Sequence, residues 1–283
     1  MLGCIRDGFL RLYMKTPEHP MKYRFVRWLG QNVFPLRGVQ KVVYPDLRLW
    51  LHPRDWIEYL LLRGDKYEPL TLDFLMANLH TGDYAALAGV NFGQHVAVAA
   101  RAVGPTGRVL GVEPQPRALA KAWDNLQLNR LSGCVTMVSS ALGSRNEMVT
   151  MAWSDQGNAG AASLLDEGSG LTVHVTPLPR ILQAVGINQV RMFLLDVQGF
   201  EAHVIQGMEG GPLPEIIVVE VDDLFVERAG TTPVQLLHQI KGLGYELFSI
   251  DGRPVVPENA ELPERNVVGL RPGVTAVWSR LPT

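Results

Sequence analysis

Two glycines and one glutamate have the residue types and spacing of a nucleotide-cofactor site. Gly89 and Gly93 lie where the short apolar run Tyr84–Val90 gives way to a predicted helix. Glycines at such a turn let the backbone approach a ligand closely, and the helix N-terminus favours an anionic group. Glu113 follows the next apolar run, roughly the 20 residues downstream at which a carboxylate binds ribose hydroxyls. These residues predict a crevice for an adenosine-containing cofactor.

Each of these residues also has a purely structural interpretation. The Gly-x-x-x-Gly spacing differs from the Gly-x-Gly-x-x-Gly fingerprint of dinucleotide-binding proteins. Gly89 and Gly93 equally fit a tight strand-to-helix turn with no ligand. Glu113 equally fits a solvated loop. The position of Glu113 where an apolar strand meets a loop favours the cofactor interpretation.

A second group of residues is suited to acid–base chemistry. Asp196 ends the apolar run Met192–Val197, at the edge where open α/β sheets place ligand-binding groups. Glu201 opens the following helix, where it is a candidate catalytic acid or simply a favourable partner of the helix dipole. His203 is a candidate base, as is His95, although lone histidines are commonly surface or core residues.

No cysteine and histidine cluster has zinc-ligand spacing, and we expect no metal. One alternative stays open. Glu220 and Asp222–Asp223 end another apolar run, and together with Asp196 they offer the oxygen ligands that divalent cations prefer.

Short apolar runs that alternate with helical segments would position these residues. Runs of four to six apolar residues indicate a parallel sheet covered on both faces. The predicted strands are 84–90, 108–112, 135–138, 192–197, 216–221, 245–250 and 275–279, with added strands at 148–153 and 171–175. The predicted helices are 55–62, 70–79, 95–103, 116–131, 178–185, 200–208 and 233–243, with a short amphipathic helix at the N-terminus. The strands on either side of the loop 251–274 are expected to pair antiparallel at one edge.

The composition is that of a globular protein with a large core. The 283 residues are 47% hydrophobic and 19% charged, and 26 Lys and Arg against 28 Asp and Glu give a net charge of −2. That balance offers no basic footprint for nucleic acid, so we expect no nucleic-acid partner. Two cysteines, no membrane-spanning run and no signal-peptide pattern lead us to expect a cytoplasmic protein.

The chain resembles the FkbM family of S-adenosylmethionine-dependent methyltransferases from about residue 50 to residue 250. Several separate motifs carry this resemblance and occur in the order typical of the family. They are Gly64–Pro69, Gly104–Val109, Val112–Pro116, Ala141–Gly143, Asn158–Leu164 and Leu195–Glu201. The last of these is similar to the family's Asp-Val-Glu-Gly-x-Glu motif.

Three positions depart from the family pattern. Leu87 stands where the family has the acid of Asp-x-Gly-Ala-Asn-x-Gly, and Gln198 stands where it usually has glutamate. Pro177–Pro179 replaces a Thr-Leu-Asp sequence that begins a helix. Loss of the acid at Leu87 is expected to weaken cofactor binding, because that position usually orders the glycine loop.

The resemblance implies a class I methyltransferase fold: a mostly parallel, Rossmann-like seven-stranded α/β sheet with helices on both faces. We place this domain at residues 81–283, after a helical N-terminal segment at residues 1–80. The implied cofactor is S-adenosylmethionine, with S-adenosylhomocysteine as product. The predicted cofactor-binding residues are Tyr67, Glu68, Gly89, Asn91, Gly93, Glu113, Ser140, Ala141 and Asp196, and the predicted catalytic residues are Asp196, Glu201 and His203.

The implied reaction is methyl transfer to the hydroxyl oxygen of a small molecule, such as a sugar, a polyketide or another secondary metabolite. Two alternatives stay open. The changes at Leu87 and Gln198 also suit a catalytically inactive relative that binds a ligand or partner. A nicotinamide-dependent oxidoreductase would share the sheet, but the chain lacks a Tyr-x-x-x-Lys pair. A homodimer also stays open.

Overall fold

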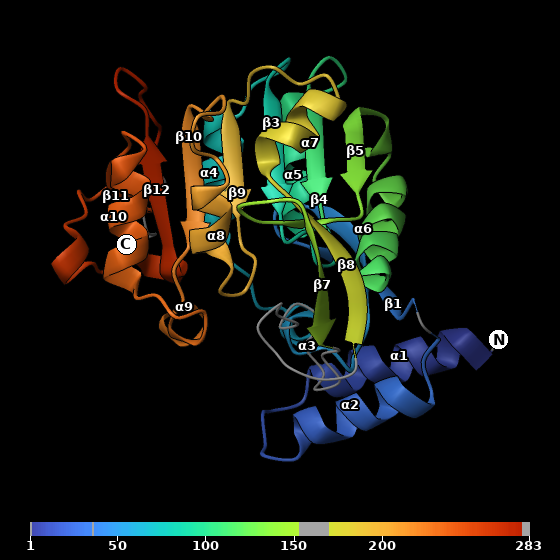
Figure 1. Ribbon diagram of the computed structural model, residues 1–283. Coiled ribbons are helices and arrows are strands. Elements are labelled where there is room, and N and C mark those ends of the chain that lie inside the picture. Colours follow the sequence, from blue (N-terminus) through green and yellow to red (C-terminus); the bar gives the residue numbers. More distant parts are fainter. Residues whose placement is uncertain (1, 36, 153–169, 279–283) are drawn as a thin grey trace.

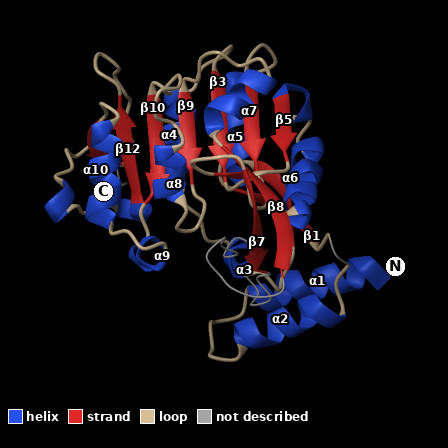
Figure 2. Ribbon diagram, viewed as in Figure 1, coloured by secondary structure: helices blue, strands red, loops and turns tan. Residues whose placement is uncertain are grey.

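The structure is a computed structural model that describes residues 2–35, 37–152 and 170–278. A seven-stranded sheet lies at its centre, with helices on both faces (Figures 1 and 2). The strands of this sheet are β3 (Tyr84–Ala88), β4 (Arg108–Val112), β5 (Val135–Val138), β9 (Met192–Leu195), β10 (Ile216–Glu220), β11 (Glu246–Ser249) and β12 (Asn266–Leu270). This architecture confirms the predicted class I methyltransferase fold.

Except for α2 and α9, which were not predicted, the helices begin and end close to the predicted positions. They are α1 (Leu2–Met14), α2 (Lys22–Asn32), α3 (Trp56–Arg63), α4 (Pro69–Asn78), α5 (Gln94–Val103), α6 (Pro116–Leu128), α7 (Leu178–Ala184), α8 (Glu201–Gln206), α9 (Asp223–Arg228) and α10 (Pro233–Gly242). Local chemistry sets several starts. The Asp55 side chain accepts hydrogen bonds from the first free amides of α3, and Thr232 forms a capping box with Gln235 at α10.

The strand order is β11-β12-β10-β9-β3-β4-β5, and every neighbouring pair from β10 to β5 is parallel. The chain leaves β3 toward β4 and β5 on one side and later returns to β9 and β10 on the other. The connections therefore diverge between β3 and β9, where open α/β sheets bind ligands at the carboxyl ends of the strands.

Alternation of side chains along the strands divides the core into two layers. Leu87, Leu194 and Val218 belong to a cluster that also contains buried residues of α4 and α5. The intervening residues Ala86 and Phe193 belong to a second cluster, with buried residues of α7, α8 and α10. Helices thus shield both faces of the sheet from water, as its continuous apolar strands predict.

The antiparallel end of the sheet is present, but its last strand was wrongly predicted. β12 pairs antiparallel with both β10 and β11 and consists of Asn266–Leu270, inside the predicted loop. Residues 275–278 form no strand. Ala276 and Trp278 instead pack on the core, where the Trp278 ring lies 5.5 Å from that of Phe74.

The two added strands are confirmed as β7 (Glu147–Ala152) and β8 (Gly170–Thr176). They pair antiparallel and join β6 (Ala141–Leu142) in a separate three-stranded sheet. The residues Asn158 and Ser163, which belong to a family motif, lie outside the described residues.

The N-terminal segment is less purely helical than predicted. It contains an antiparallel hairpin, formed by β1 (Val39–Val43) and β2 (Leu47–Leu51), in addition to α1–α4. The buried residues Leu47, Leu49 and Leu51 share one hydrophobic cluster with β3 and α5, so the segment packs directly on the sheet domain. Among the described residues, no helix is long and apolar enough to cross a membrane.

Leu87 is buried and packs on the core. Its side chain is 1% exposed and belongs to the same cluster as Val96 and Leu194. It is not among the residues that line the cleft at the end of β3, although the next two residues, Ala88 and Gly89, are. The Leu87 side chain is therefore part of the hydrophobic core, and an acid at this position would contact apolar neighbours.

We expect Leu87→Asp to lower the free energy of unfolding by about 3 kcal/mol or more, because it buries a carboxylate without a partner. Chemical denaturation monitored by circular dichroism measures this loss. Leu87→Met is the control and should cost less than about 1.5 kcal/mol. A wild-type unfolding midpoint for Leu87→Asp would mean that the position reaches solvent or the glycine turn.

Candidate active site

A cleft lies at the carboxyl ends of β3, β4 and β9, where the strand connections diverge. Its lining combines apolar residues with a few convergent polar groups, which is typical of small-molecule sites. Eight of the lining residues are Tyr67, Gly89, Asn91, Glu113, Ser140, Ala141, Asp196 and Gln198. Seven of these eight were predicted from the sequence, and the structure brings them to one place.

The glycine turn at residues 89–93 allows the ends of β3 and β9 to meet. Gly89 has a φ of +80°, and a Cβ atom there would lie 1.5 Å from the backbone oxygen of Asp196. Gly93 has a φ of +88°, and a Cβ atom there would lie 2.9 Å from the Cα atom of Ala122 in α6. Gly89 therefore shapes the cleft, whereas Gly93 permits close packing of α5 on α6 and is not a lining residue.

Glu113 connects the two loops that form the cofactor side of the cleft. It is 4% exposed, and its carboxylate accepts hydrogen bonds from the amides of Gln115 (2.9 Å) and Asn91 (3.2 Å). Burial raises the pKa of Glu113 to about 7, against the lowering effect of these amides. Each carboxylate oxygen keeps lone-pair capacity for a ribose hydroxyl. Glu113 is thus an ordered acceptor inside the cleft and not a solvated loop residue.

Tyr67 and Glu68 lie at one edge of the site with a histidine. The Glu68 carboxylate lies 3.1 Å from Nε2 of His95, and the Tyr67 ring meets the His95 ring edge-on. Burial alone would lower the pKa of His95, but the hydrogen bond and charge of Glu68 outweigh it and raise that pKa. Glu68 therefore favours the protonated form of His95, which suits electrostatic support better than proton abstraction.

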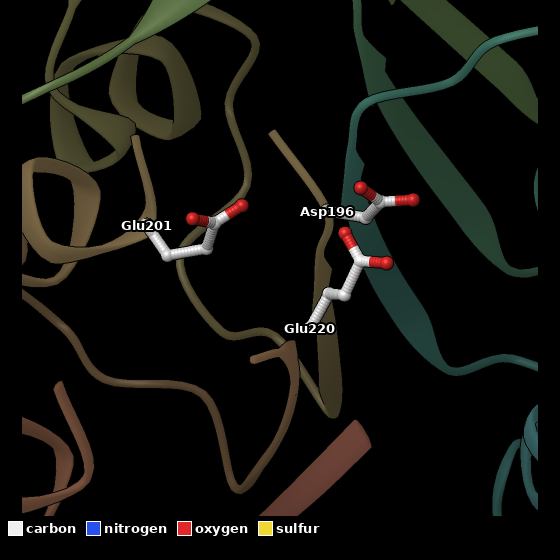
Figure 3. Close-up of side chains that lie close together, drawn as sticks. All are labelled: Asp196, Glu201 and Glu220. Carbon is white, nitrogen blue, oxygen red and sulfur yellow. The ribbon is translucent and has the colours of Figure 1, made fainter. Parts of the chain in front are cut away.

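Asp196 and Glu220 form a carboxyl pair (Figure 3), of which Asp196 lines the cleft. They follow β9 and end β10, two adjacent parallel strands. The Gln198 side-chain amide donates to both, at 2.7 Å to Asp196 and 3.1 Å to Glu220. Burial, and then the charge of Asp196, raise the pKa of Glu220 well above its usual range. Burial also raises the pKa of Asp196, and the two carboxyl groups titrate as a pair.

Glu201 holds the loop that carries Asp196. It is 1% exposed, and one of its carboxylate oxygens accepts hydrogen bonds from the amides of Val197 (2.9 Å) and Gly199 (3.2 Å). Burial raises its pKa to about 7. These contacts favour a positioning role for Glu201.

A divalent cation would find three carboxylates here. One ligand oxygen each from Asp196, Glu201 and Glu220 lies within 4.8 Å of the others, and the second oxygen of Glu201 is buried without a hydrogen-bond partner. The Gln198 amide already donates to Asp196 and Glu220, however, and a cation would have to displace it. The residues as arranged satisfy one another by hydrogen bonding, and we assign no metal to them.

His203 lies away from this cleft. Its ring stacks on Phe200 at 4.2 Å, and it lines a separate hollow beside α10. Phe200 is the residue of that pair that lines the cofactor cleft. The structure therefore does not bring His203 to Asp196, which removes the geometric basis for its predicted role as a base.

Ser140 and Ala141 close the opposite edge of the cleft. The buried Ser140 hydroxyl lies 3.0 Å from the His174 carbonyl oxygen, to which it donates. This bond connects the end of β5 to β8. Both predicted residues are lining residues, and the backbone there is held by the three-stranded sheet.

Two functional candidates were missing from the predicted site. Glu220 ends an apolar strand next to the strand that Asp196 follows. The sequence pattern indicated Glu220 only as a possible metal ligand. Gln198 was identified only as a departure from the family pattern, whereas its side-chain amide donates hydrogen bonds to both members of the carboxyl pair. A glutamate at position 198 would offer only carboxylate oxygen atoms and would lack the N–H donor of Gln198.

The raised pKa values predict how stability depends on pH. Glu113 and Glu201 have folded-state pKa values of about 7, above their usual value of 4.5, so the folded state binds protons more tightly. Their stabilising contribution is complete below about pH 4.5 and is lost as pH rises through about 7. The melting temperature of the ligand-free protein should therefore fall between pH 6 and pH 8.

Differential scanning fluorimetry across that pH range measures this effect. Glu113→Gln should flatten the curve, because the amide does not ionise. Glu246→Gln, on the exposed edge of the sheet, is the matched control and should keep the wild-type slope. A melting temperature that rises from pH 6 to pH 8 would contradict the raised pKa values.

Comparison with known proteins agrees with this arrangement. The family described as "Methyltransferase FkbM domain" matches residues 88–247, which is more than half of the chain. No curated protein matches the sequence.

Solved structures that are similar to the chain include a SAM-dependent O-methyltransferase from Thermotoga maritima, with 16% identity over 77% of this chain and 68% of that one, at a TM-score of 0.42. They also include the O-methyltransferase TomG from Streptomyces achromogenes, with 13% identity over 72% of this chain and 78% of that one, at a TM-score of 0.42.

A methyltransferase from Geobacter sulfurreducens is also similar, with 16% identity over 73% of this chain and 79% of that one, at a TM-score of 0.43. The family match covers the glycine turn, Glu113, the Asp196 motif and Glu220. The chain belongs to the FkbM family of S-adenosylmethionine-dependent methyltransferases.

Proposed function

We propose that this protein transfers a methyl group from S-adenosylmethionine to a hydroxyl oxygen of a small molecule. The observation that carries this proposal is the Asp196–Glu220 carboxyl pair beside the glycine turn. The family supplies the cofactor, and the pair supplies a base next to the place where the cofactor is expected. An alcohol whose pKa lies far above 7 needs such a base as its oxygen forms a new bond.

The residues of the cleft fit the cofactor. Glu113 would accept hydrogen bonds from the ribose hydroxyls, while Gly89 and Asn91 provide backbone close to the ligand. Ser140 and Ala141 would border the adenosine side, and Tyr67 and Glu68 the opposite edge. When bound, the cofactor supplies an activated methyl group, so the protein mainly has to align the acceptor oxygen.

Asp196 is the proposed base. As the ionised member of the pair it accepts the proton of the acceptor hydroxyl, while the Gln198 amide holds its carboxylate in place. Burial raises the pKa of Asp196 above its usual value, which makes it a stronger base than an exposed aspartate. Glu220 positions Asp196 as the other member of the pair, and Glu201 positions the backbone loop.

The acceptor class is also part of the proposal. The family resemblance implies a sugar, a polyketide or another secondary metabolite, and a cytoplasmic setting suits such a reaction. The N-terminal segment from residue 1 to about residue 80 would select the acceptor, since Ile57 and Tyr67 of this segment line the cleft.

A second candidate is an inactive relative that binds a ligand without transferring a methyl group. The observation in its favour is Leu87, which removes an acid that the family pattern usually has. Its position in the core shows why a leucine is tolerated there, and a titration with the cofactor separates the two functions.

S-adenosylmethionine at about 100 times its Kd should add about 2.7 kcal/mol to the free energy of unfolding. Glu113→Ala should weaken binding at least about tenfold, because it removes a charged hydrogen-bond acceptor. Chemical denaturation with and without S-adenosylmethionine measures the first effect, and isothermal titration calorimetry measures the second. Glu246→Ala on the exposed edge of the sheet is the control. A folded wild-type protein that binds neither S-adenosylmethionine nor S-adenosylhomocysteine would support the inactive relative.

Asp196→Asn should lower kcat by about 10² to 10⁴ while S-adenosylmethionine affinity changes little, because the amide cannot accept the proton. Initial rates of S-adenosylhomocysteine formation with a panel of hydroxylated acceptors measure this loss. The wild-type rate should rise with pH as Asp196 ionises. Asp223→Asn, an exposed residue on α9, is the control, and wild-type kcat in Asp196→Asn would exclude the proposed base.

A further inference from the structure

The first two helices present an exposed apolar surface that the methyltransferase function does not use. Six residues, here named the α1–α2 face, are each at least 37% exposed. They are Ile5, Phe9, Leu12, Met21, Phe25 and Trp28. Figure 1 shows α1 and α2 next to each other at one end of the molecule, away from the central sheet.

Helical spacing makes this face continuous. Ile5, Phe9 and Leu12 are separated by four and three residues, and so are Met21, Phe25 and Trp28, so each set forms one stripe along its helix. Aromatic rings connect the stripes. Tyr13 stacks on Phe9 at 6.0 Å and meets Phe25 edge-on at 5.2 Å, and Phe25 lies 6.2 Å from Trp28.

The opposite sides of both helices are anchored in the core. Leu10, Met14 and Val26 are buried in the cluster shared with the sheet domain. The Lys22 ammonium, which is fully buried, donates to the carbonyl oxygens of Met14 (3.1 Å) and Thr16 (2.6 Å) and so joins the two helices. The α1–α2 face is therefore held in a fixed shape by a packed base.

Positive charge borders this face. Arg11, Lys15 and Arg24 are exposed on the same two helices. On the other side of α1, where Leu10 and Met14 lie, a hollow is lined by apolar side chains and by five cationic residues, with no acidic residue in its lining. These cations are Arg11, Lys15, Lys41, Arg48 and Arg63.

Most of this charge is uncompensated. Arg63 pairs with Asp65. Arg11 donates to the Gln40 carbonyl oxygen and Lys41 to the carbonyl oxygens of α3, which fixes their positions without neutralising them. In the described part of the chain, no carboxylate forms an ion pair with Lys15 or Arg48.

We propose that the α1–α2 face docks on the surface of a bilayer that contains anionic lipids. An amphipathic helix with a basic border and Trp, Phe and Leu on its apolar side lies in the plane of a membrane interface. Tryptophan is enriched at that depth, where its ring is apolar and its N–H meets water. The exposed Lys15 and Arg24 would meet lipid phosphate groups at the border of this face.

Charge argues against the two other occupants of such a surface. In a symmetric dimer the same patch meets itself, so the cations around this face would oppose cations of the second copy. A nucleic acid would match the charge, but it would leave Ile5, Leu12 and Met21 against a phosphate backbone. A bilayer surface satisfies both the apolar residues and the cations.

Co-sedimentation of the full-length protein with vesicles tests this proposal. One set of vesicles contains phosphatidylcholine alone, and the other contains phosphatidylcholine and phosphatidylglycerol in a ratio of about 3 to 1. Wild-type protein should pellet with the anionic vesicles, bind the neutral ones more weakly, and be released by high salt, because screening weakens charge attraction.

The variants separate the two contributions. The double variant Phe25→Ser with Trp28→Ser should weaken partitioning at least about tenfold, since each ring loses its apolar burial. Lys15→Glu should weaken binding to anionic vesicles about fivefold or more. Leu224→Ser, which removes an exposed leucine from α9 far along the chain, is the matched control and should bind like wild type.

Three results would overturn the proposal. They are failure of the wild-type protein to bind anionic vesicles, equal binding by the Phe25 and Trp28 double variant, and a wild-type dimer in solution that this variant converts to a monomer. S-adenosylmethionine affinity should be unchanged in all of these variants. The membrane proposal and the proposed methyl transfer can therefore fail separately.

Discussion

The site depends on one close approach between two pieces of backbone. The turn after β3 passes so near the end of β9 that any side chain on Gly89 would overlap the Asp196 carbonyl group. This contact brings Asp196 into the same cleft as Asn91 and Glu113, although Asp196 lies more than 80 residues after both of them in the sequence. The parallel register of β3 and β9 sets the height at which the two loops meet. A larger residue at position 89 would therefore push apart the turn that carries Asn91 and the loop that carries Asp196.

The second constraint is electrostatic. Five carboxyl groups surround the cleft, namely Glu68, Glu113, Asp196, Glu201 and Glu220. Burial disfavours their ionised forms, and backbone amides, the His95 ring and the amide of Gln198 lie beside them as partners. The departure at Gln198 then has a physical reason, because an amide can donate to two carboxyl groups where a glutamate would repel them.

The N-terminal segment has two faces with different tasks. Its inner face adds leucines of the β1–β2 hairpin and of α3 to the core beneath β3. Its outer face exposes aromatic rings and cations on α1 and α2. Such a division is typical of a segment that stabilises a domain and also presents a surface to a partner, and it places that surface on the part of the chain that also lines the cleft through Ile57.

Periodicity and local chemistry within the sequence determined most of the elements and the fold class. The apolar runs predicted the parallel strands, and Gly89, Glu113 and Asp196 were found because ligand-binding groups follow buried strands at a known edge. The sequence did not reveal β12, whose apolar residues lie between two turns, or the pairing of Glu220 with Asp196. It also placed His203 at the site on the basis of proximity to Glu201 along the chain.

Only the tertiary structure decided which of these groups meet. Helix phase turned His203 toward Phe200 and α10, and strand alternation turned Leu87 into the core. The parallel register of β9 and β10 brought two carboxylates within reach of one amide. These outcomes depend on how elements pack against one another, because a side chain's direction follows from the twist and contacts of its element. Residue type and spacing alone carry the chemistry that a site needs, but not the direction in which each group points.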